Sequence, residues 1–223
     1  MFELITALPT AFDEEGLIQT KGIKEMVRFN IDNNKVDGLY VGGSTGEAFL
    51  LSFEDKKELF KAVAEENQGA VKLMAQIGSL NINESMELAR YVEALGYDVV
   101  SAVPPFYYKF SKEEVLNYYE KLTAASNLPM VIYSIPVLSG VEFDMNDFDR
   151  LFANEKIIGV KYTAQDFYLL ERLRTQYPNK KIYSGFDEAL LPALSLGVDG
   201  AIGSTFNVNA PLVREIVAAF AAG

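Results

Sequence analysis

Residues 130–163, MVIYSIPVLSGVEFDMNDFDRLFANEKIIGVKYT, contain the repeating unit that decides the fold. The apolar run Met130–Ile135 is too short for a helix and is typical of a buried strand. Asp144–Phe152 then has the polar start and the spaced apolar residues of an amphipathic helix, and a second apolar run, Ile157–Tyr162, follows it. A strand, a helix and a strand in this order predict two parallel strands joined by a crossover helix.

The same unit recurs along the chain. Ser111 and Glu114 have the spacing of a capping box and predict the start of one helix, and Ser52 begins another. The other predicted helices are Asn81–Leu95, Asp144–Phe152, Asp166–Tyr177 and Pro211–Phe220. The predicted strands are Leu4–Leu8, Gly38–Gly42, Val71–Ile77, Asp98–Val103, Met130–Ile135, Ile157–Tyr162, Lys181–Gly185 and Gly200–Ser204.

Eight strand–helix units in 223 residues are what a closed (β/α)8 barrel, the TIM barrel, requires. A doubly wound open sheet is the alternative, and it would usually need a glycine-rich turn after the first strand. That turn, Leu8–Phe12, contains no glycine. Since no linker or low-complexity segment divides the chain, we predict a single (β/α)8 barrel domain over residues 1–223.

The composition excludes several kinds of chemistry. The chain has no Cys, which removes thiolate nucleophiles and disulfides, and no His, which removes imidazole bases and histidine-ligated metals. Acid–base or covalent chemistry must therefore use Lys, Tyr, Asp, Glu, Ser or Thr. A metal-dependent aldolase is disfavoured because no imidazole can hold the ion.

The charge balance disfavours a nucleic-acid partner, and the lack of a long apolar run disfavours a membrane protein. The chain carries 20 basic and 31 acidic residues, a net charge of −11, and no basic stripe that could face a nucleic-acid backbone. It has no apolar run long enough to span a membrane, and its start lacks the features of a signal peptide. We expect a cytoplasmic protein with a small-molecule substrate.

Lys161 is the strongest candidate nucleophile. In a (β/α)8 barrel the active site lies at the carboxyl ends of the strands, and Lys161 ends the run Ile157–Lys161. Lys72, in contrast, falls near the start of its strand. Apolar surroundings disfavour an ammonium group and leave free amine, which can attack a carbonyl and form a Schiff base. The alternative is a structural lysine paired with Asp or Glu.

Two further segments reach the same end of the predicted barrel. The turn Gly42–Glu47 contains Ser44 and Thr45, and its glycines expose backbone N–H groups, so it can hold a carboxylate or phosphate, although many such turns have no ligand. Tyr133 lies at the end of the fifth strand, where a phenol can transfer a proton. Packing is the alternative role for Tyr133 and for the tyrosines after strand four.

The turns after the last two strands add carboxylates and hydroxyls. These turns are Gly185–Glu188 and Gly203–Asn207, and their polar groups suit a substrate with several hydroxyls, each of which needs a partner when buried. The adjacent Asp187 and Glu188 could also suggest a metal site, but no second acidic cluster lies near them in the sequence. The residues together favour a metal-free Schiff-base enzyme for an anionic carbonyl substrate.

This combination resembles the N-acetylneuraminate lyase and dihydrodipicolinate synthase superfamily of class I aldolases. The resemblance covers essentially the whole chain and depends on Gly42–Glu47, Tyr133 and Lys161. The segment Tyr133–Gly140 is most similar to the N-acetylneuraminate lyase branch, because the synthases carry an arginine where this chain has Leu138. The resemblance implies reversible cleavage of N-acetylneuraminate to pyruvate and N-acetylmannosamine, without a cofactor.

The resemblance also implies roles for single residues. Lys161 would form the Schiff base with the keto carbon, Tyr133 would relay a proton, and Ser44 and Thr45 would hold the pyruvyl carboxylate. Tyr107 matches a tyrosine that reaches the site of a neighbouring subunit, which implies a homo-oligomer. The positions that match the lining of the sugar pocket are Thr163, Gly185, Asp187, Glu188 and Ser204.

Two features depart from the superfamily pattern. Its members continue beyond the eighth barrel helix into a C-terminal helical extension, whereas this sequence ends at Gly223, so subunit contacts made by the extension would be lost or replaced. Together with the lack of His, Cys and Trp, this suggests an engineered or trimmed variant. The remaining alternatives are a related pyruvate-dependent aldolase, of the synthase or 2-keto-3-deoxy sugar acid type, and a barrel that binds its ligand with little turnover.

Overall fold

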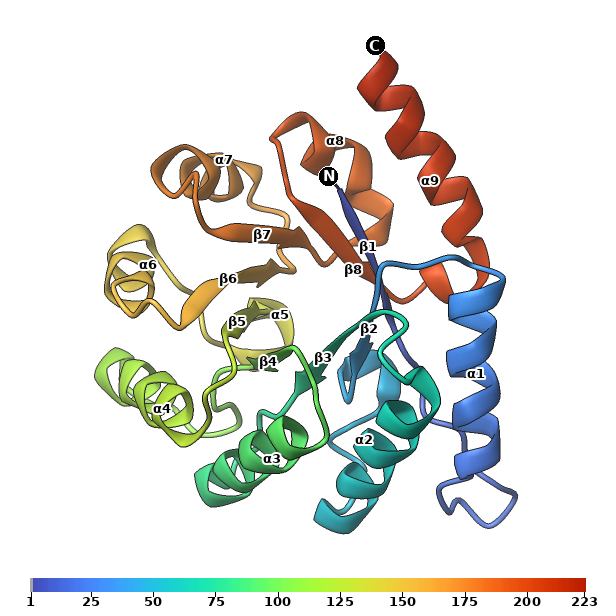
Figure 1. The fold of residues 1–223 in the computed structure, drawn as a ribbon. Helices are drawn as coiled ribbons and strands as arrows, with labels where there is room; N and C mark the ends of the chain where they lie inside the picture. Colours follow the sequence, from blue (N-terminus) through green and yellow to red (C-terminus); the bar gives the residue numbers. More distant parts are fainter. Residues whose placement is uncertain (1) are drawn as a thin grey trace.

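The computed structural model describes residues 2–223 and contains a closed barrel of eight parallel strands in chain order, so the TIM-barrel prediction is confirmed (Figure 1). Each strand pairs with its sequence neighbours, and β8 closes the barrel against β1. The strands are β1 Glu3–Ala7, β2 Gly38–Val41, β3 Lys72–Gln76, β4 Val99–Ala102, β5 Met130–Ser134, β6 Ile157–Tyr162, β7 Lys181–Ser184 and β8 Gly200–Gly203.

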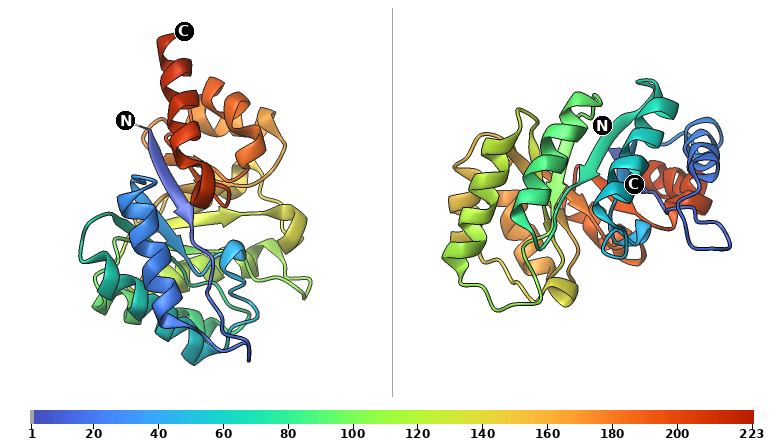
Figure 2. Two further views of the ribbon diagram at one scale, coloured as in Figure 1. Left: turned by 90° about the vertical axis from the view of Figure 1, so that its right-hand side faces the viewer. Right: turned by 90° about the horizontal axis from the view of Figure 1, so that it is seen from below.

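The helices surround the barrel (Figures 1 and 2). They are α1 Thr20–Asp32, α2 Phe53–Asn67, α3 Ile82–Ala94, α4 Lys112–Ala125, α5 Pro136–Ser139, α6 Met145–Phe152, α7 Phe167–Gln176, α8 Leu190–Ser195 and α9 Phe206–Ala222. Two short 3-10 helices, η1 Ser44–Gly46 and η2 Asp187–Ala189, follow β2 and β7. None of the helices described between residues 2 and 223 is long and apolar enough to cross a membrane.

Five of the predicted helix starts are N-caps in the structure. Ser52 and Ser111 each form a complete capping box, with Asp55 and Glu114 respectively. The last predicted helix, Pro211–Phe220, lies within α9, and Pro211 is in the first turn of the helical segment that follows a kink at Asn209; only the short segment 206–208 before the kink was not predicted. Asn209 leaves the helical conformation two residues before the proline, and this kink accommodates the ring and the missing N–H of Pro211.

Two apolar layers hold the barrel together. The larger layer lies between the strands and the surrounding helices, and it includes Leu39, Val160 and Phe206. The smaller one fills the barrel interior with alternate residues of the strands, including Tyr40, Tyr133 and Tyr183. The interior positions at the carboxyl ends of the strands therefore meet above a packed floor, where a reactive side chain is kept away from bulk water.

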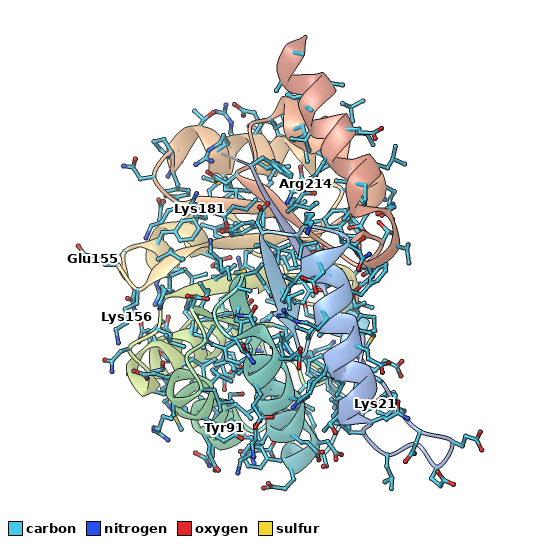
Figure 3. All side chains as sticks on the ribbon, turned by 45° about the vertical axis from the view of Figure 1, so that its right-hand side comes forward. Lys21, Tyr91, Glu155, Lys156, Lys181 and Arg214 are labelled. Atoms are coloured by element: carbon cyan, nitrogen blue, oxygen red, sulfur yellow. The ribbon has the colours of Figure 1, made fainter. Side chains whose placement is uncertain are left out.

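A charged cluster closes the opposite, amino-terminal end of the barrel. Glu3 on β1 accepts hydrogen bonds from Lys72 Nζ at 2.5 Å and from the Tyr183 hydroxyl at 3.1 Å. Lys181, which Figure 3 labels at the start of β7, lies 3.5 Å from the same carboxylate. Burial alone would raise the pKa of Glu3, but these hydrogen bonds and positive charges outweigh it and lower the pKa. Lys72 is therefore occupied in a structural ion pair, far from the carboxyl ends of the strands.

We expect Glu3→Gln to lower the free energy of unfolding by about 1–2 kcal/mol at pH 7, less than for a fully buried pair because solvent screens part of the charge. Since the pKa of Glu3 is lowered in the folded state, its stabilising contribution is present above the ordinary carboxyl range and is lost as the pH falls through the lowered pKa. Urea denaturation between pH 7 and pH 4 measures this. If the difference in the free energy of unfolding between Glu3→Gln and the wild type became larger toward acid pH, the assignment would be contradicted.

Candidate active site

Lys161 and Tyr133 lie side by side inside the barrel at the carboxyl ends of β6 and β5. They are partners in the parallel register of these two strands, so both side chains point into the same interior. Lys161 is 4% exposed and Tyr133 is 3% exposed. The sequence placed both residues at the ends of their strands, and the structure brings them together.

The Lys161 amine is surrounded by aromatic rings rather than by carboxylates. Its Nζ lies 4.0 Å from the centre of the Tyr133 ring and 4.3 Å from the centre of the Tyr40 ring. Within the part of the chain that the structure describes, this nitrogen forms no hydrogen bond and no ion pair. The carboxylate partner that would make Lys161 a structural ion-pair residue is therefore missing from residues 2–223.

Tyr40 is part of this site, and the sequence analysis did not identify it. Its side chain is fully buried, its hydroxyl lies 3.0 Å from Ser101 Oγ, and its ring packs edge-on against Tyr133 at 5.9 Å. Burial raises the pKa of Tyr40 well above its ordinary value, so this phenol stays neutral. Its position two residues before Gly42, on the inward-facing side of β2, is the signal that could have found it.

The glycine-rich turn after β2 forms the next wall of the site. Gly42 has φ +71°, which allows the chain to turn directly into η1. Ser44 Oγ then lies 3.4 Å from the Tyr133 hydroxyl, and Thr45 Oγ1 lies 2.6 Å from Ser204 Oγ in the turn after β8. The backbone N–H groups of Ser44 and Thr45 donate no hydrogen bond to any residue between 2 and 223. This turn therefore offers two hydroxyls and two free N–H donors to an anion.

Thr163 supplies a buried hydroxyl on the β7 side of Lys161. Its Oγ1 is inaccessible to solvent and has no hydrogen-bond partner among residues 2–223. A side chain at Gly185 would overlap with this hydroxyl, so the glycine is what leaves room for it. An unpaired buried hydroxyl costs free energy, and a bound polyol could offset that cost by pairing with it.

The other predicted site residues differ in how they are placed. Asp187 accepts hydrogen bonds from the backbone N–H and hydroxyl of Thr205 at 2.7 and 2.8 Å, so one of its oxygens ties the β7 and β8 turns together. Glu188 is exposed and forms no hydrogen bond or ion pair within the described residues. Tyr107 is 81% exposed in the loop after β4, where its ring packs against Tyr108.

A mostly apolar cavity of about 290 Å³ adjoins Ser44 at this end of the barrel. It is lined by residues from the β2, β4 and β5 turns, among them Phe49, Leu50, Phe106 and Leu138. Among residues 2–223, no arginine or lysine lines this cavity, so this side of the site offers no cation for a second carboxylate.

Comparison with known proteins identifies the family of this chain. The model of the dihydrodipicolinate synthetase family matches residues 1–223. The N-acetylneuraminate lyase of Histophilus somni (strain 2336) is 55% identical over 213 residues, which are 96% of this chain and 73% of the relative. The N-acetylneuraminate lyase of Haemophilus influenzae is 54% identical over the same shares of the two chains.

Solved structures show the same similarity. CdNal from Clostridium difficile in complex with mannosamine has a TM-score of 0.96 at 54% identity and covers 98% of this chain and 75% of its own. N-acetylneuraminate lyase from Fusobacterium nucleatum complexed with pyruvate has a TM-score of 0.94 at 52% identity and covers 99% and 74%. From the complete match to the family model and from relatives above 50% identity, this chain belongs to the dihydrodipicolinate synthetase family.

Proposed function

We propose that this protein is a class I aldolase that reversibly cleaves N-acetylneuraminate to pyruvate and N-acetylmannosamine through a Schiff base on Lys161. The observation that carries the proposal is the Lys161 amine, buried between two tyrosine rings without a carboxylate partner in residues 2–223 and beside a turn with free hydroxyl and N–H donors. Two relatives above 50% identity, both named N-acetylneuraminate lyase, support the substrate.

The chemistry follows from this placement. The Lys161 amine attacks the keto carbon of the open-chain sugar acid, and loss of water gives a protonated imine. The Tyr133 hydroxyl accepts the proton of the C4 hydroxyl while it passes its own proton to the substrate carboxylate, the C3–C4 bond breaks, and the electron pair of that bond moves toward the imine nitrogen to give an enamine. The C4 carbon leaves as the aldehyde of N-acetylmannosamine. Protonation of the enamine at C3 and hydrolysis of the imine then release pyruvate and restore Lys161.

The surrounding residues fit the two halves of this substrate. Ser44 and Thr45, with their N–H groups, hold the pyruvyl carboxylate, and Ser44 Oγ connects that carboxylate to the Tyr133 hydroxyl. The sugar hydroxyls face the β6–β8 turns, whose candidate contacts are Thr163, Gly185, Asp187, Glu188 and Ser204. Leu138 in the apolar cavity disfavours a dicarboxylate substrate of the synthase type, because leucine cannot form an ion pair with a second carboxylate.

We propose that the protein acts as a homo-oligomer in which Tyr107 reaches the site of a neighbouring subunit. Tyr107 and Tyr108 are 81% and 67% exposed, and Leu50, at 79%, is exposed beside the apolar cavity. A face with several exposed large apolar side chains is typical of a protein interface. Sedimentation equilibrium tests this proposal, and a strictly monomeric, active protein would contradict it.

The decisive test measures pyruvate release from N-acetylneuraminate and traps the imine with borohydride in the presence of pyruvate. We expect turnover and a stable adduct whose peptide maps to Lys161. Efficient cleavage of other 2-keto acids but not of N-acetylneuraminate would favour the related aldolases. An adduct on a folded protein without turnover would favour the barrel that binds its ligand only.

Thr163→Val is expected to separate substrate binding from stability. Valine keeps the shape of threonine and removes a buried hydroxyl that has no partner in residues 2–223, so the free energy of unfolding should stay equal or rise by up to about 1 kcal/mol. The kcat/KM for N-acetylneuraminate should fall about tenfold or more, because a substrate hydroxyl then loses its partner. Denaturation and steady-state kinetics check both values. A clear loss of stability with unchanged kcat/KM would show that the hydroxyl has a structural role.

Three features stay predictions from the sequence: a single domain over residues 1–223, a cytoplasmic location, and activity without a cofactor.

A further inference from the structure

A cluster of three asparagine side chains connects α1 to the turn that carries Ser204. Asn30 and Asn34 come from the end of α1 and the residues after it, and they are 1% and 4% exposed. Asn207 lies in the first turn of α9. Figures 1 and 2 show the beginning of α9 beside the end of α1, and the hydrogen bonds between the asparagines join the two segments.

Asn207 is the member of this cluster that faces the candidate site. Its Nδ2 donates to the carbonyl oxygen of Ser204 at 2.8 Å and to that of Ala7, at the carboxyl end of β1, also at 2.8 Å. Its Oδ1 accepts from Asn30 Nδ2 at 3.1 Å, which fixes the direction of the carboxamide. One side chain therefore ties the Ser204 turn to β1 and is itself held from α1.

The Asn34 side chain forms hydrogen bonds to the backbone of the same segment. Its Nδ2 lies 2.9 Å from the carbonyl oxygen of Asn207, 3.2 Å from that of Phe206 and 3.0 Å from Asn30 Oδ1. Apolar side chains of similar size could fill a buried position like this one without a loss of stability. A fully paired amide network has the additional effect that its hydrogen bonds fix the orientation of the segments that it joins. Amide groups do not titrate, so this arrangement does not change with pH.

We propose that Asn207 is a positioning residue for the sugar half of the substrate, acting through Ser204. Ser204 Oγ lies 2.6 Å from Thr45 Oγ1, so the placement of Ser204 determines how the β8 turn meets the β2 turn. The turn after β2 has supports of its own: Gly46 N–H donates to Gly43 at 3.1 Å, and the Thr10 hydroxyl donates to Gly46 at 2.6 Å. Loosening Ser204 thus disturbs the sugar contacts and leaves the carboxylate site largely intact.

This inference rests on the proposed function, and the test separates the two. Asn207→Ala is compared with Asn67→Ala, a matched control in which another buried asparagine bonds only to the backbone of Val71, before β3. Each variant is assayed for N-acetylneuraminate cleavage and for borohydride trapping of pyruvate on Lys161. We expect Asn207→Ala to lower kcat/KM about tenfold, mainly through KM, and to change the pyruvate concentration for half-maximal trapping less than about threefold. We expect Asn67→Ala to lower the melting temperature but to change neither kcat/KM nor the pyruvate concentration for half-maximal trapping.

The outcomes are distinct. Equal kcat/KM for the two variants, or a loss of pyruvate trapping in proportion to kcat/KM, overturns the role of Asn207. If Asn207→Ala does not fold, Asn30→Ala decides, because it removes the bond that orients Asn207 and leaves the bonds to Ser204 and Ala7 in place. The kcat/KM of Asn30→Ala should be about threefold lower than that of Asn67→Ala. If the two values are equal, the proposal is overturned. If the wild-type protein gives no borohydride adduct on Lys161, the proposed function itself is overturned, and this inference with it.

Discussion

Lys161→Ala is expected to reduce cleavage of N-acetylneuraminate by more than about 10⁴-fold while the barrel remains folded. The covalent route has no substitute nucleophile at this end of the barrel, because Lys72, a half-buried lysine of the barrel interior, is bonded to Glu3 at the opposite end. The fold should survive, because no ion pair or hydrogen bond of Lys161 is lost within residues 2–223, and removal of a desolvated amine relieves a cost. Pyruvate release and the denaturation midpoint measure the two effects.

Lys72→Met is the matched control for this prediction. It removes a second lysine from the barrel interior, but one that stabilises the protein through Glu3 rather than taking part in chemistry. We expect it to lower the midpoint of urea denaturation and to leave kcat of the folded protein unchanged. Activity that survives in Lys161→Ala, or a borohydride adduct mapped to another lysine, would contradict the Schiff-base assignment.

The fold could be predicted because its signals are local. Each strand appears as a short apolar run, and the capping boxes at Ser52 and Ser111 depend on residues only three positions apart. The barrel rule then placed Lys161 and Tyr133 at one end. Pro211 marks the first turn of the helical segment after the kink at Asn209, and the segment 206–208 before the kink was missed because no side chain caps its start at Thr205.

The contacts that complete the site could not be predicted, because they join distant parts of the chain. Thr45 and Ser204 are 159 positions apart, and Asn30 and Asn207 are 177 apart. Tyr40 belongs to an ordinary apolar run, and only the closed barrel shows that its ring faces Lys161. Which hydroxyl or amide meets which depends on how the closed barrel places side chains that are far apart in the sequence, and the local pattern around each residue does not specify its distant partner.

The second large effect is expected from Tyr133→Phe, which should lower kcat about 10²- to 10³-fold and alter pyruvate binding far less. Only one oxygen is lost. The ring that lies 4.0 Å from Lys161 Nζ and packs edge-on against Tyr40 is retained, so the amine keeps its surroundings. The hydroxyl that relays the C4 proton and lies 3.4 Å from Ser44 Oγ disappears. Steady-state kinetics and borohydride trapping with pyruvate measure the two steps separately.

Tyr119→Phe controls for the loss of a buried hydroxyl. Tyr119 is also fully buried, and its hydroxyl donates to the Ala102 carbonyl at 3.0 Å in the layer between strands and helices. Its removal should cost about 1 kcal/mol of stability and leave kcat unchanged. If pyruvate affinity collapsed in Tyr133→Phe while kcat stayed near the wild-type value, Tyr133 would be a binding residue, and the proton would have to pass from the C4 hydroxyl to another acceptor. The split between the two measurements, rather than the loss of activity, therefore decides whether Tyr133 transfers the proton.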